Sequence, residues 1–524
     1  MTWPRIAALV TLSSLAACGD DGAASNSTAG SSTTATEPTS TGAETAAADE
    51  TGTDTSTGEP TEPGACAEPI PAHTPDTARL QIGEGGRFVD SLGRSVVMRG
   101  INTGGRSKYA PFIPFEVTDA TDLDEVRTAA DEYFARVVPW GLDTVRMPFS
   151  WEALEPTPGT YDLEYLARYE VLLDAAWAHR LRVIVDFHQD VYASPFCGDG
   201  FPPWSVPTPD PPEPSHDCPD WFVGYFSGED VRESFDRFWT DADGLQGPFL
   251  AMWSTMAEAV GEHPAVVGLE PMNEPGWGTM DDIEAFKAEV LEPWYTTVAA
   301  ELQAIAPEAL IFYDGPAAES SGTAGTHLHP SGTGLVYAPH LYDGTLLLGD
   351  GWTGIDPSPR VAAMANFGVE AGVPVLLGEF GYPHATKGGA PWLTLVMDTV
   401  DSSRMSATLW EYSTTTELWN AEDLSVTEPD GTDRPILDTY VRPWVRALAG
   451  SNLAVQWDAE SGAYDVSWTA AEGFTEIVLP ARRFGTELPP LELEGEGACH
   501  TWDEARGELR VTAAAGTSVA LRLR

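Results

Sequence analysis

From about Ala78 onward, short apolar runs typical of buried strands alternate with segments in which apolar residues recur every three or four positions. The predicted strands are Val96–Ile101, Thr144–Met147, Arg182–Phe187, Val266–Glu270, Leu310–Tyr313, Leu335–Ala338, Val373–Leu377 and Thr408–Tyr412. The predicted helices between them include Leu123–Val138, Leu163–Ala178, Ser234–Val260, Ile283–Ile305, Arg360–Ala371 and Pro391–Ser402. This alternation predicts parallel βαβ units, and eight of them predict an α/β fold, a (β/α)₈ TIM barrel over residues 78–450.

The pattern changes at both ends of this region. Leu80–Ile82 and Arg87–Val89 flank a glycine-rich turn, which predicts a small hairpin at the start. Beyond Gly450 the chain contains only short alternating segments with turn residues between them, such as Leu453–Trp457 and Ala463–Trp468. We therefore expect residues 451–524 to form a small antiparallel β-sandwich.

The N-terminal segment lacks the composition of a folded domain. Arg5 and the apolar run after it predict a signal peptide over residues 1–17, and Leu15-Ala16-Ala17-Cys18 resembles a bacterial lipobox with Cys18 as the lipidated residue. Residues 18–77, above all the Ser/Thr/Ala/Gly/Glu-rich part up to Pro63, predict a disordered tether. We expect a lipid-anchored protein of the bacterial cell envelope or a secreted one.

The charge excludes some classes of partner. The chain has 80 acidic and 28 basic residues, giving a formal net charge of -52. Nucleic acids and anionic lipid surfaces require clustered lysine and arginine, so we expect no nucleic-acid partner and no membrane binding through a basic patch. We expect membrane association through the lipid anchor, and a monomer.

Five cysteines fit an exported protein. Lipidation of Cys18 leaves four, of which Cys197 and Cys218 lie in one proline-rich loop and are expected to pair. Cys66 would then pair with Cys499 and tie the start of the folded region to the C-terminal domain. Other pairings and free thiols remain open at this point.

Polar residues follow the predicted strands at one end. Because the carboxyl ends of barrel strands meet at one rim, where TIM-barrel active sites lie, we expect these side chains to converge. They are Arg146, His188, Asp190, Asn273, Glu274, His340, Tyr342, Glu379 and Trp410. Two carboxyl groups facing each other across a sugar suit glycoside hydrolysis, with one protonated to assist the leaving group and the other ionised to attack.

This set resembles the signature of glycoside hydrolase family 5 in order and in strand position. It includes Asn273-Glu274-Pro275, His340-x-Tyr342 and Gly378-Glu379-Phe380-Gly381. The resemblance implies a retaining enzyme with Glu274 as acid/base and Glu379 as nucleophile. It further implies that Asn273 binds the sugar 2-hydroxyl, that Arg146 and Tyr342 keep Glu379 ionised and oriented, that His188 and His340 line the glycone subsite, and that Trp410 is a stacking platform.

A narrower resemblance is to endoglycoceramidases, which cut between the glycan and the ceramide of glycosphingolipids. It rests on Met98–Asn102, Lys108–Pro111, Asp186–Tyr192 and Arg442–Gly450. It implies that Lys108 and Asp190 contact the sugar nearest the ceramide. The proline-rich stretch Phe201–Pro219, with its own cysteine, leaves the head group open.

The sequence also leaves other functions open. A relative of the same family could be an endo-β-glucanase, or a β-glycosidase of steryl or other glycosides, and a non-catalytic carbohydrate-binding lipoprotein is a further alternative. His327 and His329 are close in sequence, but two histidines in a glycine-rich loop do not define a metal site. We expect no metal and no cofactor.

Overall fold

The computed structural model describes residues 64–118, 120–206, 218, 221–320, 325–414 and 422–524. The predicted signal peptide, the lipidation of Cys18 and the tether up to Pro63 lie outside these residues. In the part of the chain that is described, no helix combines the length and the apolar character needed to cross a membrane.

Eight parallel strands form the predicted barrel. In chain order they are β4 (Arg99–Thr103), β5 (Thr144–Phe149), β6 (Arg182–Phe187), β7 (Val266–Glu270), β8 (Leu310–Tyr313), β9 (Leu335–Tyr337), β11 (Leu376–Leu377) and β13 (Ser406–Tyr412). A bridge between Tyr337 and Val375 joins β9 to the segment before β11, and the short parallel strands β10 (His340–Leu341) and β12 (Glu379–Phe380) extend that junction. The sheet is thereby closed.

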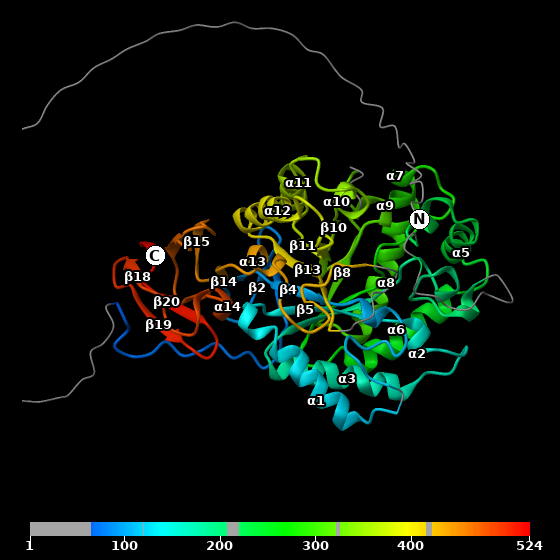
Figure 1. Ribbon diagram of the computed structural model, residues 1–524, viewed down its shortest axis with the longest axis horizontal. Coiled ribbons are helices and arrows are strands. Elements are labelled where there is room, and N and C mark those ends of the chain that lie inside the picture. Colours follow the sequence, from blue (N-terminus) through cyan, green and yellow to red (C-terminus); the bar gives the residue numbers. More distant parts are fainter. Residues whose placement is uncertain (1–63, 119, 207–217, 219–220, 321–324, 415–421) are drawn as a thin grey trace, which may run out of the picture. The chain divides into compact units, whose positions relative to one another are not determined.

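Helices surround the barrel strands (Figure 1). The longer ones are α1 (Leu123–Ala135), α3 (Leu163–Ala178), α5 (Glu229–Trp239), α6 (Gln246–Val260), α8 (Glu292–Ile305), α11 (Ser358–Ala371) and α12 (Gly389–Ser403). The shorter ones are α2 (Trp151–Leu154), α4 (Val223–Ser227), α7 (Ile283–Phe286), α9 (Ala317–Ser320), α10 (Gly344–Leu347) and α13 (Ile436–Tyr440). A further short helix, α14 (Ala481–Phe484), belongs to the C-terminal domain. Asp122 and Asp162 cap α1 and α3 by accepting hydrogen bonds from backbone N–H groups of the first turn.

Two predicted helices are interrupted. The segment 234–260 is split between α5 and α6 by a turn in which Asp241 and Gly244 have positive φ. The segment 283–305 contains a π-helical turn at Lys287–Leu291, which ends two residues before Pro293. A proline has no N–H to donate, so it disturbs the regular hydrogen bonding of the turn before it.

The C-terminal sandwich consists of two antiparallel sheets. One contains β1 (Gln81–Gly83), β2 (Arg87–Val89), β3 (Ser95–Val96), β14 (Trp444–Leu448), β17 (Thr475–Val478), β20 (Glu508–Thr512) and β19 (Cys499–Asp503). The other contains β15 (Gly450–Trp457), β16 (Tyr464–Ala470), β21 (Ser518–Leu523) and β18 (Leu491–Glu494). Residues of both sheets, including Ile477, Leu509 and Leu521, share one buried core.

Two expected domain boundaries require correction. β14 precedes Gly450 and pairs with both β3 and β17, so the sandwich begins before residue 451 and includes the N-terminal hairpin. Residues 64–77 are not a free tether, because Cys66 is disulfide-bonded to Cys499 and the N–H of Ile70 donates to Thr501 Oγ1 at 2.9 Å. The covalent link and the burial of Ile70 hold this segment on the sandwich.

Both predicted disulfides are confirmed. Cys66 bonds Cys499, and Cys197 bonds Cys218. The first joins residues 433 positions apart, which attaches the start of the described chain to the C-terminal domain.

Candidate active site

The predicted site residues gather at the carboxyl ends of the barrel strands. Six of them line one pocket of about 360 Å³: Lys108, Asp190, Glu274, Tyr342, Glu379 and Trp410. The other four are buried and bond to pocket-lining residues or lie against them: Arg146, His188, Asn273 and His340. The structure therefore brings together all ten residues that the sequence singled out for catalysis and substrate binding.

Glu379 is held by hydrogen bonds to both carboxylate oxygens. The guanidinium of Arg146 donates from Nη1 to Glu379 Oε1 at 2.7 Å, and the hydroxyl of Tyr342 donates to Oε2 at 2.9 Å. Arg146 has no exposed surface, so its charge acts on Glu379 with little screening by water. Arg146 Nη2 also donates to Asn273 Oδ1 at 2.8 Å. This arrangement fixes Glu379 as an oriented carboxylate.

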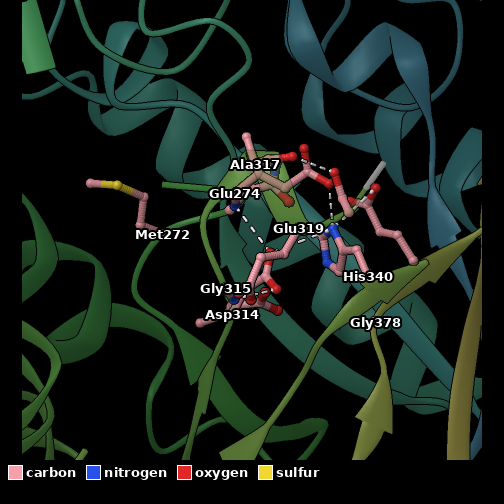
Figure 2. A network of polar contacts seen from close by, with 12 residues as sticks. Met272, Glu274, Asp314, Gly315, Ala317, Glu319, His340 and Gly378 are labelled. Atoms are coloured by element: carbon pink, nitrogen blue, oxygen red, sulfur yellow. Dashed lines mark hydrogen bonds and ion pairs between the residues drawn. The ribbon is translucent and has the colours of Figure 1, made fainter. Parts of the chain in front are cut away.

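Glu274 lies opposite Glu379 in a different environment. Figure 2 shows its carboxyl beside His340, whose Nδ1 is 2.8 Å from Glu274 Oε1. Burial, together with the negative charge of Asp190, raises the pKa of Glu274 to about 8. Burial lowers the pKa of His340 to about 4, so the imidazole is neutral at pH 7. Glu274 therefore carries a proton at neutral pH.

The distance between the two carboxyl groups indicates whether the reaction retains or inverts the configuration of the anomeric carbon. One carboxylate oxygen of Glu274, one of Glu379 and a ring nitrogen of His340 all lie within 4.8 Å of one another. Carboxyl groups about 5 Å apart fit a covalent mechanism with retention, whereas inversion needs about 6.5 to 9.5 Å. Among the described residues, these three also form the one group whose donor atoms could hold a metal ion.

Lys108 and Asp190 form a buried ion pair beside the two glutamates. Lys108 Nζ donates to Asp190 Oδ2 at 2.7 Å and lies 4.5 Å from the centre of the Trp410 ring. Burial would lower the pKa of Lys108, but the negative charges of Asp190 and of three other carboxyl groups together outweigh it and raise the pKa well above its usual value. The pair presents polar groups to the pocket, next to the aromatic face of Trp410.

His188 supports the same wall of the pocket. Its Nδ1 is 2.7 Å from Asp186 Oδ2, its Nε2 is 3.2 Å from Asp190 Oδ2, and its ring stacks on Trp410 with 5.2 Å between ring centres. Burial and Lys108 would lower the pKa of His188, but Asp186 and Asp190 raise it to about 10. His188 and Lys108 are therefore both cations in contact with Asp190.

Several buried polar residues of the site were missed by the sequence analysis. Arg146 Nε donates to Glu270 Oε2 at 2.7 Å, its Nη1 donates to Asn102 Oδ1 at 3.0 Å, and its Nη2 lies 3.1 Å from Asp186 Oδ2. Asp314 follows β8 and accepts a hydrogen bond from the N–H of Glu274 at 3.2 Å. The sequence feature that could have indicated these residues is an acidic or amide side chain inside an apolar strand or just after it.

The pocket is lined by apolar as well as polar side chains. The apolar ones come from α4 and α10, from residues next to these helices and from loops that follow barrel strands. They are Trp221, Phe222, Phe226, Leu347, Leu348, Pro383 and Leu424. Phe226 and Leu348 expose 53% and 63% of their surface, which leaves apolar area at the mouth of the pocket.

Known proteins resemble the chain over the barrel. The sequence model of the family described as Cellulase (glycosyl hydrolase family 5) matches residues 99–416. Endoglycoceramidase I of Rhodococcus hoagii is 32% identical over 200 residues, which is 37% of this chain and 37% of that protein. A glucosylceramidase of Aspergillus fumigatus is 36% identical over 140 residues, 24% of this chain and 18% of that protein. The matched segments thus span well under two thirds of these relatives.

Solved structures extend the likeness to most of the fold. Endoglycoceramidase II from Rhodococcus sp., in complex with ganglioside GM3, aligns over 84% of this chain and 99% of that chain, with 25% identity and a TM-score of 0.67. Sterylglucosidase 1 of Cryptococcus neoformans aligns over 86% of this chain and 98% of that chain, with a TM-score of 0.69, but at 16% identity it supports the fold alone. With a family match over more than half of its length, the chain belongs to glycosyl hydrolase family 5.

Proposed function

We propose that this protein is a retaining glycoside hydrolase that cleaves the β-glycosidic bond between the glycan and the ceramide of glycosphingolipids. The observation that carries the proposal is the pair of glutamates, whose oxygens lie within 4.8 Å and whose surroundings differ in charge. The cationic Arg146 and the Tyr342 hydroxyl donate hydrogen bonds to Glu379, whereas the neutral His340 lies beside Glu274.

In the first step, a carboxylate oxygen of Glu379 attacks the anomeric carbon and the bond to the aglycone oxygen breaks. The Glu274 carboxyl gives its proton to that oxygen, which leaves as the ceramide hydroxyl. Glu379 is now an ester and no longer carries charge. In the second step, Glu274 as carboxylate takes a proton from water, the hydroxide attacks the anomeric carbon, and Glu379 is released.

The mixed lining of the pocket supports a lipid aglycone. Lys108, Asp190 and Trp410 offer hydrogen bonds and a flat ring to a sugar, while the apolar side chains of the same lining offer surface to a lipid. These include Phe222, Phe226, Leu347 and Leu348. A polysaccharide would need polar and aromatic groups on both sides. Similarity to endoglycoceramidases over the barrel and the sandwich supports the same substrate class.

A related β-glycosidase activity is the second candidate. Glucosylceramidases and an ergosteryl-β-glucosidase of Saccharomyces cerevisiae are 30 to 36% identical to this chain over 129 to 152 residues. Such an enzyme would use the same two glutamates on a single sugar carried by ceramide or a sterol. The candidates therefore differ in the sugar and the aglycone, and share the chemistry.

A panel of substrates tests the proposal. It contains glucosylceramide, lactosylceramide, ganglioside GM3, a steryl glucoside and a soluble β-glucan, with products identified by mass spectrometry. We expect release of the intact glycan from at least one ceramide conjugate, faster than any cleavage of the β-glucan. Cleavage of the steryl glucoside alone would support the second candidate, and cleavage of the β-glucan alone would refute both.

The raised pKa of Glu274 predicts a basic limit to activity. The first step needs Glu274 protonated, and its pKa is about 8, so kcat/KM should fall as the pH rises through that value. The measurement is kcat/KM on the preferred lipid glycoside between about pH 5 and about pH 10. A basic limb near the usual carboxyl pKa of about 4.3 would contradict the environment described for Glu274.

A further inference from the structure

Glu274 has an unusual backbone conformation. Its φ is +36°, in the left-handed region that residues with a Cβ adopt only when their surroundings hold them there. Asn273 lies three residues beyond the end of β7, and its N–H donates to the carbonyl of Phe187 in β6 at 2.9 Å, whereas the N–H and the carbonyl of Glu274 bind side chains. The direction of the Glu274 carboxyl therefore depends on the groups that bind this peptide.

Gln189 binds this segment from one side. Its Nε2 donates to the carbonyl oxygens of both Asn273 and Glu274 at 2.8 Å, and its Oε1 accepts from the N–H of Tyr192 at 2.9 Å. Gln189 has no exposed surface and does not line the pocket described above. Its amide thus joins the loop after β6 to the loop that carries Glu274.

Asp314 binds the same segment from the next strand. Its Oδ2 accepts from the N–H of Glu274 at 3.2 Å, and its Oδ1 accepts from the N–H of Gly315 at 2.6 Å. Figure 2 shows Asp314 below Glu274, with the bond between them drawn. The carbonyl and the N–H of Glu274 are therefore each bound by a buried side chain from the loop that follows a neighbouring barrel strand.

We propose that Gln189 and Asp314 are positioning residues for acid catalysis: they hold Glu274 in its left-handed conformation and so direct its carboxyl at the leaving-group oxygen. Neither side chain is required to touch the substrate. The inference rests on the proposed function, because it takes Glu274 as the acid.

If these hydrogen bonds are removed, kcat/KM should fall by an amount that depends on the leaving group of the substrate. When Glu274 is displaced, departure of a poor leaving group such as a ceramide alkoxide slows, since it needs the proton. A 2,4-dinitrophenolate leaves without protonation, so its departure is unaffected. A purely structural defect would slow both substrates alike, because it would also disturb Glu379 and the sugar-binding groups.

The test compares Gln189→Met with a matched control. Methionine keeps the length of the side chain and removes the hydrogen bonds that Nε2 donates to the carbonyls of Asn273 and Glu274. It also removes the bond to the Tyr225 hydroxyl at 3.0 Å and the one accepted from Tyr192. Gln246→Met is the control, because Gln246 Nε2 likewise donates to two successive carbonyls, those of Phe238 at 2.9 Å and Trp239 at 3.3 Å, outside the active site. For each variant, kcat/KM is measured on a ceramide glycoside and on the 2,4-dinitrophenyl glycoside of the same sugar.

We expect Gln189→Met to lose about 10²-fold in kcat/KM on the ceramide glycoside and less than about threefold on the dinitrophenyl glycoside. Gln246→Met should retain the wild-type ratio of the two values. Asp314→Asn should show the same selective loss, because one amide oxygen cannot accept from both the Glu274 and the Gly315 N–H. This second variant serves if Gln189→Met does not fold.

If these variants lost kcat/KM equally on both substrates, or on neither, Gln189 and Asp314 would not be positioning residues. Failure of the proposed function would appear differently. If the loss in kcat/KM caused by Glu274→Gln did not depend on the leaving group, Glu274 would not be the acid. This conclusion would hold whatever the results for the Gln189 and Asp314 variants.

Discussion

Replacing Glu379 with glutamine should lower kcat on a glycolipid substrate by at least about 10⁴-fold, because the amide cannot form the glycosyl-enzyme. Glutamine has the same shape and can keep one hydrogen bond to Arg146 or Tyr342, which lie 2.7 and 2.9 Å from the carboxylate oxygens. The pocket should therefore remain intact. Steady-state turnover and binding of the uncleaved substrate would separate lost chemistry from lost affinity.

A matched control for this variant is Glu155→Gln. Glu155 is also a buried glutamate with two hydrogen bonds, from Trp151 Nε1 at 2.6 Å and from the N–H of Gly159 at 2.7 Å, but it does not line the pocket. We expect it to retain turnover within about threefold, with at most a modest fall in Tm. A Glu379→Gln enzyme that turns over at the wild-type rate would refute the nucleophile assignment.

The second large effect is expected at Glu274. Glu274→Ala should lose about 10² to 10⁴-fold in kcat/KM on the ceramide glycoside, because general acid catalysis contributes about that much. On a 2,4-dinitrophenyl glycoside, kcat/KM should remain close to wild type, since no proton is needed. Turnover of this substrate should then be limited by the second step, in which Glu274 activates water.

Azide distinguishes this role from a structural one. A small anion that is already a nucleophile does not need Glu274 as base, so it should raise kcat of Glu274→Ala on the dinitrophenyl glycoside and yield the β-glycosyl azide. Product configuration can be read by proton NMR. No effect of azide, or an α-glycosyl azide, would contradict the acid/base assignment.

The barrel could be predicted because its strands are buried on both faces and therefore appear as continuous apolar runs. The predicted strand at 182–187 coincides with β6, and that at 266–270 coincides with β7. Polar residues after such runs converge at one rim by the geometry of the fold alone. The pocket accordingly contains Glu274 and Glu379, as predicted.

Other features depend on contacts that no local pattern carries. Val96 of β3 pairs with Ala447 of β14, so the N-terminal hairpin belongs to the C-terminal sandwich. Asp186 and Glu270 lie in apolar strands. In the sequence, an acidic residue there indicates the end of the strand and not an ion-pair partner of Arg146. Their role becomes visible only when the barrel brings β5, β6 and β7 side by side.

In the proposed mechanism, Glu379 forms a covalent bond with the sugar. A 2-deoxy-2-fluoro glycoside with a dinitrophenyl leaving group slows the second step more than the first, so it should trap the glycosyl-enzyme. Mass spectrometry of the intact protein and its proteolytic peptides is the measurement. We predict a mass increase of one fluorosugar, located on Glu379 within Gly378–Gly381. A label on another residue, or turnover without any covalent species, would refute Glu379 as the nucleophile.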